Sequence, residues 1–188
     1  MKIGFAFCGS FCTFAPAIDQ LKKFAGNGHE LVPIMSFNAS VIDTRFGAAK
    51  EHISKIEMIC GKSVIKTIED AEPLGPREKL DMLIICPCTG NTLAKLALGV
   101  TDTPVTMASK AHLRGDRPLI IALATNDGLS ANLSNLNAMQ KRKSVYFVPM
   151  SQDDPEKKPH SLVCDFEKLS DTFYAALRGE QLRPLFLD

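Results

Sequence analysis

Short segments that are apolar almost throughout recur along this chain, and segments with helical periodicity separate them. The expected strands cover 2–8, 29–35, 63–68, 81–86, 118–124 and 145–150. The expected helices cover 16–28, 38–60, 91–98, 103–113, 129–142 and 166–178. Strands that are apolar along their whole length are typical of parallel sheets, which are covered on both faces. The pattern therefore predicts an α/β fold: a doubly wound, mainly parallel sheet with helices on both faces.

The length and composition of the chain exclude several classes of protein. Its 188 residues are 45% hydrophobic, which suits one globular domain over 1–188. A net charge of +1 gives no electrostatic reason to expect nucleic acid or an anionic membrane as partner. The apolar run at the N-terminus is too short for a signal peptide or a membrane span, which predicts a cytoplasmic protein. The six cysteines lack zinc-site spacing, so we expect free thiols and no metal site.

The first expected strand is followed by Gly9 and Ser10. Ligands of doubly wound sheets bind beyond the carboxyl ends of the strands. A glycine at such a point lets the backbone turn tightly, and the helix that follows offers free N–H groups. This predicts a phosphate loop, although the glycines match neither the dinucleotide-binding nor the Walker pattern. The alternative is a simple connection between strand and helix.

The second expected strand is followed by Ser36, Asn38 and Ser40. Nicotinamide dinucleotide folds place an acidic residue here to hold a ribose hydroxyl. Hydroxyl and amide groups suit a phosphate better, which makes Ser36 a candidate ligand. Helix capping by Ser36 or Asn38 is the alternative.

Two further strand ends carry polar, uncharged residues. Pro87 is expected to end the strand before it, because it cannot donate to a strand ladder. Thr89 and Asn91 then place a hydroxyl and an amide at a helix start, and Asn126 follows the next strand. The alternatives are helix capping by Thr89 and Asn91 and an Asn-Asp-Gly turn at Asn126.

These strand ends together predict a pocket for a flat, hydrogen-bonding ligand with a phosphate tail, a description that fits flavin mononucleotide (FMN). The predicted site consists of Gly9, Ser10, Ser36, Thr89, Asn91 and Asn126. No catalytic residue is assigned. The segment 150–161 contains Lys157, Lys158 and His160, any of which could attract a small dicarboxylate. The alternative for that segment is a solvated surface loop.

Residues 87–92 (PCTGNT), followed by Lys95, Gly99 and Asp102, resemble the Pro-Ala-Ser-Ala-Asn-Thr motif of the flavoprotein family that includes the flavin-containing cysteine decarboxylases. Gly9-Ser10 matches that family's phosphate loop after the first strand, and Ser36 matches its hydroxyl after the second strand. Residues 123–126 (LATN) are similar to its Pro-Ala-Met-Asn motif. The resemblance implies FMN as cofactor and a homo-oligomer. The family's catalytic histidine is missing, because 71–81 (AEPLGPREKLD) has none, so decarboxylation is not expected.

A narrower resemblance covers nearly the whole chain. The segments 69–76, 86–114, 124–129 and 146–163 resemble the family of dipicolinate synthase B subunits from spore-forming bacteria. The resemblance implies a part in oxidising a dihydrodipicolinate precursor to dipicolinic acid in the mother cell during sporulation, and it implies a partner, the A subunit of dipicolinate synthase. Two roles stay open: a redox subunit that uses a flavin, and a flavin-free binding or scaffold subunit that supports a catalytic A subunit.

Overall fold

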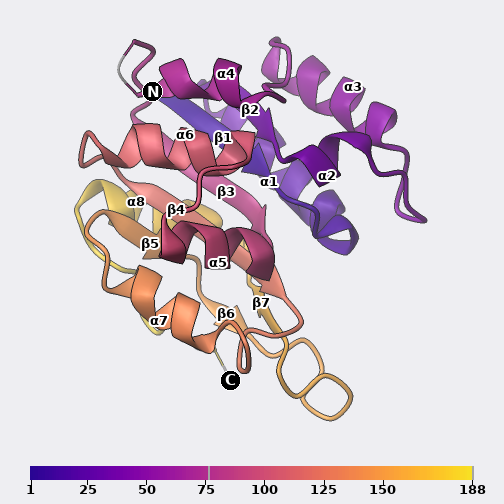
Figure 1. Cartoon of the computed structure of the whole chain (residues 1–188), viewed down its shortest axis with the longest axis vertical. Helices are drawn as coiled ribbons and strands as arrows, with labels where there is room; N and C mark the ends of the chain where they lie inside the picture. The colour runs from indigo at the N-terminus through magenta and orange to yellow at the C-terminus, as the bar shows by residue number, and fades with distance from the viewer. Residues whose placement is uncertain (76, 188) are drawn as a thin grey trace.

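A sheet with five parallel strands organises the molecule (Figure 1). The computed structural model describes residues 1–75 and 77–187. The parallel strands are β1 Lys2–Phe7, β2 Glu30–Met35, β3 Met82–Cys88, β4 Leu119–Thr125 and β5 Val145–Phe147. Their order is β2-β1-β3-β4, and β5 pairs with β4. The strand order reverses between β1 and β3, and such a switch point is where a crevice opens at the carboxyl ends of the strands.

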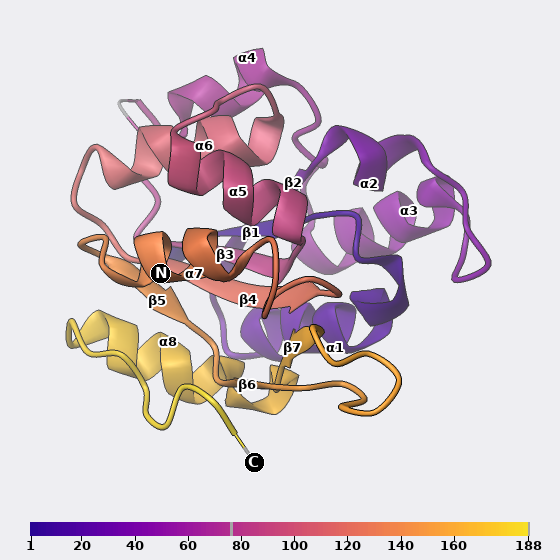
Figure 2. The same cartoon turned by 60° about the horizontal axis from the view of Figure 1, so that its bottom comes forward.

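Helices cover both faces of this sheet, as the sequence predicts. They are α1 Phe14–Gly26, α2 Phe37–Val41, α3 Ala49–Cys60, α4 Ile68–Ala71, α5 Gly90–Leu98, α6 Pro104–Leu113, α7 Leu133–Gln140 and α8 Leu169–Leu177. Figure 2 shows α1 and α8 on one side of the strands, with α5, α6 and α7 on the other. The predicted doubly wound, mainly parallel α/β fold is confirmed. Within residues 1–75 and 77–187, no helix is long and apolar enough to cross a membrane.

The strands that the sequence marks most clearly form the centre of the core. Every residue of β3 is buried, and so are Leu119 to Ala124 of β4. The pair Ile84 and Ile120, which face each other across these strands, is fully buried. Because both faces of the two strands are covered, no polar alternation is needed along them.

The predicted helix over 38–60 is wrong in its middle, where the chain forms two helices. A loop separates α2 from α3, and within it Thr44 and Gly47 exchange two backbone hydrogen bonds of 3.1 Å. The Asp43 carboxylate accepts from the N–H of Ala49 at 2.8 Å, at the start of α3. These contacts stabilise a turn in which Gly47 has a φ of 131°, a conformation that glycine adopts readily.

The predicted strand over 63–68 is reduced to one bridge beside β2. The N–H of Ile65 donates to the Pro33 carbonyl and the Ile65 carbonyl accepts from Met35, both at 2.9 Å. Pro33 offers a carbonyl but no N–H at this edge, so the ladder cannot be extended through it.

The prediction that Pro87 ends its strand is also wrong, because β3 continues through it to Cys88. The pairing of β3 with β4 shifts register between Ile85 and Cys88, so one extra residue of β3 is accommodated there. Such a bulge tolerates a proline, and the Pro87 carbonyl still accepts from the N–H of Cys8 at 3.0 Å. The bulge lies directly before the start of α5 and so helps to aim that helix.

The strands and the helix of the C-terminal part differ from the predicted ones. The expected strand over 145–150 divides at Pro149 into β5 and the short β6 Met150–Ser151. A further strand, β7 Leu162–Cys164, pairs antiparallel with both β4 and β6 and has no counterpart among the predicted strands. The expected helix over 129–142 is shortened to α7, because the residues before it form turns at Asp127.

Candidate functional site

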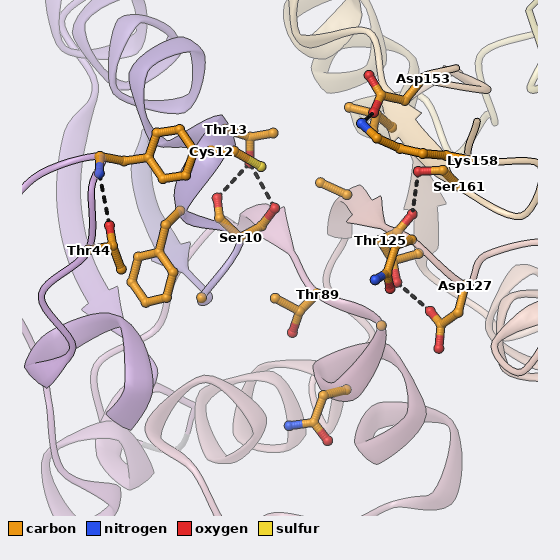
Figure 3. Close-up of a pocket in the computed structure, with 18 of the residues that line it drawn as sticks. Ser10, Cys12, Thr13, Thr44, Thr89, Thr125, Asp127, Asp153, Lys158 and Ser161 are labelled. Carbon is orange, nitrogen blue, oxygen red and sulfur yellow. Dashed lines mark hydrogen bonds and ion pairs between the residues drawn. The ribbon is translucent and has the colours of Figure 1, made fainter. Parts of the chain in front are cut away.

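A cavity of about 780 Å³ opens at the carboxyl ends of β1, β3 and β4 (Figure 3). Its walls come from four segments, 9–13, 44–46, 89–91 and 124–127, and from residues of the chain between β6 and β7 and of β7 itself. Because the carboxyl ends of parallel strands meet at one edge of a sheet, residues far apart in sequence converge here.

Five of the six predicted site residues line this cavity: Gly9, Ser10, Thr89, Asn91 and Asn126. Ser36 is not among the lining residues. Its side chain is buried at the start of α2, where Oγ accepts from the N–H of Ala39 at 3.4 Å. The capping that the sequence allows for Ser36 is thus present in the structure, and a contact between Ser36 and a ligand stays a prediction.

The wall formed by 9–13 offers hydroxyl groups and two helix starts. Thr13 Oγ1 donates to the Ser10 carbonyl at 2.8 Å and lies 3.1 Å from Ser10 Oγ. Among the described residues, no side chain caps the short 3₁₀ helix over Phe11–Thr13 or α1 behind it. Uncapped N–H groups at a helix start are suited to bind an anion such as a phosphate.

The start of α5 forms the opposite wall and is tightly packed. Thr89 caps the helix, with Oγ1 accepting from the N–H of Thr92 at 3.2 Å. A Cβ atom on Gly90 would lie 2.5 Å from both Thr125 Oγ1 and Asn132 Nδ2. Only glycine fits at this position without displacing its neighbours, which brings the backbone of α5 against the turn after β4.

Asp127 is a lining residue held in place by protein donors. Asn132 Nδ2 lies 2.9 Å from each carboxylate oxygen of Asp127, and Thr125 Oγ1 also donates to Oδ1. These contacts fix the carboxylate beside Gly90 and take up much of its capacity to accept hydrogen bonds.

Two cationic side chains line the cavity, and they come from loops rather than from strand ends. Arg45 follows α2, and its guanidinium carbon lies 4.8 Å from the centre of the Phe46 ring. Lys158 lies between β6 and β7 and forms an ion pair with Asp153. The hydrogen bond with Asp153 raises the pKa of the Lys158 ammonium, so this group is fully charged at neutral pH.

A group of buried thiols lies under the floor of the cavity. Thr92 Oγ1 lies 3.3 Å from Cys8 Sγ, directly below the start of α5. A hydrogen bond from Cys88 is the main cause that lowers the pKa of the Cys8 thiol, and that same contact raises the pKa of Cys88. Both side chains are fully buried. They therefore support the floor rather than meet a ligand.

The sequence analysis does not predict Arg45 and Phe46 as site residues, because both lie inside the segment expected to form one helix. Gly47 is the signal that could have marked the turn. Of the three candidates in the segment 150–161, Lys158 lines the cavity, whereas Lys157 and His160 do not.

The chemistry of the lining residues favours binding over proton transfer. No histidine of the described chain lines the cavity, and the hydroxyl and amide groups there exchange protons poorly at neutral pH. In the part of the chain that the structure describes, no group of three or more His, Cys, Asp or Glu residues could hold a metal ion. Hydroxyls, amides, uncapped helix starts and aromatic rings fit a phosphorylated planar ring.

Comparison with known proteins identifies the family of this chain. A family model described as Flavoprotein matches residues 1–176. The dipicolinate synthase B subunit of Bacillus subtilis (strain 168) is 41% identical over 187 residues, which cover 100% of this chain and 94% of that protein. The crystal structure of the dipicolinate synthase B subunit from Bacillus halodurans has a TM-score of 0.91 at 37% identity, covering 100% of this chain and 96% of the other. An FMN-dependent cysteine decarboxylase, with a TM-score of 0.69 at 21% identity over 95% of this chain and 97% of its own, shares the fold.

Proposed function

Because this chain belongs to the flavoprotein family, and within it to the dipicolinate synthase B subunits, we propose that its cavity binds FMN and that it acts with the A subunit in oxidising a dihydrodipicolinate precursor to dipicolinic acid. The observation that carries the proposal is the convergence of Gly9, Ser10, Thr89, Asn91 and Asn126 on one cavity. The same cavity is lined by the aromatic residue Phe11 and adjoins an uncapped helix start.

The residues of the cavity divide by chemistry into two groups that suit the two ends of FMN. Gly9, Ser10 and Thr13, at the start of α1, would hold the phosphate, since helix starts and hydroxyls favour anions. Thr89, Asn91 and Asn126 would meet the polar edge of the ring, because amides both donate and accept hydrogen bonds. Bound FMN would supply a two-electron acceptor, which the aromatisation of the precursor requires.

The role of the protein in this proposal is to bind and orient. The lining hydroxyls and amides can position ligands within the cavity. Because no histidine of the described chain lines the cavity, the flavin-free scaffold role is the second candidate. In that role the same cavity would hold the substrate while the A subunit performs the reaction.

A flavin titration followed by anaerobic addition of the precursor separates the two roles. We expect the purified chain to bind FMN, with a changed visible spectrum, and the precursor to bleach that absorbance once the A subunit is added, as the flavin is reduced. Binding without bleaching, whether or not the A subunit is present, would favour the scaffold role. A chain that binds no FMN would remove the cofactor from the proposal.

We also propose that the chain assembles with copies of itself in the mother cell of a sporulating bacterium. Phe37, Val41 and Ile42 are large apolar residues that are exposed in and directly after α2. Neighbouring exposed apolar side chains are typical of protein contact surfaces. Sedimentation of the purified chain tests the assembly: a monomer at micromolar concentration contradicts it.

A further inference from the structure

The turn over Thr44–Gly47 is held by hydrogen bonds and lines the cavity through Thr44, Arg45 and Phe46. The backbone hydrogen bonds between its two ends are both 3.1 Å long, and the N–H of Phe46 donates to Thr44 Oγ1 at 3.1 Å. A Cβ atom on Gly47 would lie 2.7 Å from His52 Nε2, so the turn is seated closely against α3. Its two outer residues, Arg45 and Phe46, are thereby presented together.

The other charged side chains that line the cavity have hydrogen-bond or ion-pair partners within the protein. Asp127 is held by Thr125 and Asn132, and Asp153 is paired with Lys158. Within residues 1–75 and 77–187, Arg45 has no ion-pair partner. An arginine whose fork of donors is free suits a planar carboxylate, which it can bind through two parallel hydrogen bonds.

Phe46 adds an apolar surface beside this cation. The Phe46 side chain lines the cavity and is 45% exposed. We expect a bound ligand to cover this exposed surface. A planar ring that carries a carboxylate matches both residues, since the ring can contact Phe46 while the carboxylate meets Arg45.

Lys158 offers a second cationic point on another wall. Figure 3 shows Lys158 and Asp153 across the cavity from Thr44. The ion pair between Lys158 and Asp153 is exposed, and an exposed pair of this kind adds little to stability because water already solvates both charges. A ligand carboxylate can therefore replace Asp153 as the partner of Lys158 at little cost.

Resting on the proposed function, we infer that the cavity recognises a planar ring with two carboxylates, through Arg45 and Phe46 on one side and Lys158 on the other. Two cations on separate walls select for two carboxylates, because a ligand with one carboxylate can contact only one of them. These residues determine specificity; they are not assigned a chemical step.

Calorimetric titration with pyridine-2,6-dicarboxylate and with pyridine-2-carboxylate tests the inference. We expect the chain to bind the dicarboxylate more tightly, by about tenfold or more, because each charge-assisted hydrogen bond adds to affinity. Arg45→Gln and Lys158→Gln should each lower the affinity for the dicarboxylate by about tenfold. The affinities of each variant for the dicarboxylate and the monocarboxylate should then be similar. Lys50→Gln and Lys157→Gln are matched controls, since each removes a nearby cation that does not line the cavity.

The titrations are made on the chain without flavin and again with excess FMN. Failure of the cofactor proposal can then be distinguished from failure of the dicarboxylate inference. Dicarboxylate selectivity that depends on Arg45 and Lys158 supports the inference, whether or not FMN binds. Equal binding of both pyridines, no binding of either in both states, or equal losses in the control variants would overturn it. Near-normal thermal unfolding of the variants is expected, because both side chains are exposed.

Discussion

Gly9 and Gly90 both line the cavity, yet a side chain at each position would meet different surroundings. A Cβ atom on Gly90 would lie within 2.7 Å of three polar atoms, whereas the nearest atom to a Cβ on Gly9 is 3.5 Å away. Packing therefore requires a glycine at position 90. Position 9 has room for a small side chain, so a test of its part in ligand binding need not disturb the fold.

Replacing Gly9 by Asp places a negative charge where we propose that the phosphate of FMN binds. We expect FMN affinity to fall by about 100-fold or more, since the anion loses favourable contacts and meets a like charge. Gly9→Ala is the matched control and should retain most of the affinity. Fluorescence titration with FMN measures both. An unchanged affinity in Gly9→Asp would show that the phosphate binds elsewhere.

The elements that the sequence predicts well are those whose signal is local. β3 and β4 are continuous apolar runs, and their burial follows directly from that pattern. β7 is three residues long and exists only through its pairing with β4 and β6, which no local pattern reveals. The same distinction holds for the site: strand ends such as Thr89 converge by topology, whereas Arg45 is placed by a turn held through Gly47.

The last turn of α6 contains a histidine whose burial links stability to pH. His112 is fully buried, and its Nε2 lies 2.9 Å from the Pro118 carbonyl. Burial is the main cause that lowers the pKa of His112 from 6.5 to about 4, and nearby Arg117 also lowers this pKa. Between these values the unfolded chain binds a proton that the folded chain does not. The free energy of unfolding therefore falls as the pH drops from 6.5 to about 4.

Replacing His112 by Gln removes this titration while keeping an N–H that can donate to Pro118. We expect wild-type stability to fall by up to about 3 kcal/mol more than that of His112→Gln over this pH range. Urea unfolding at several pH values measures the difference. Parallel pH profiles for the two proteins would mean that His112 is already protonated in the folded state or accessible to water.

At the scale of the whole molecule, the cavity is open to solvent, so a ligand or a partner protein can reach its lining residues. The sheet supplies one edge, and loops on two sides supply the cations that surround it. The side chains that line the cavity include hydroxyls, amides, two ion-paired or hydrogen-bonded carboxylates and two cations, but no histidine of the described chain. Such a set binds and orients ligands well and transfers protons poorly at neutral pH.

This composition predicts that the chain alone makes no dipicolinate and that turnover requires the A subunit. The oxidation must remove a hydride and a proton from the ring, and the two lining carboxylates, Asp127 and Asp153, are already engaged by donors of the protein. The assay compares each of the two proteins alone with the two combined, using the dihydrodipicolinate precursor and a nicotinamide nucleotide. We expect turnover to be at least about tenfold faster in the mixture than the sum of the separate rates, a margin equivalent to about 1.4 kcal/mol. Full turnover by this chain alone would contradict the prediction, and full turnover by its partner alone would reduce this chain to a stabilising role.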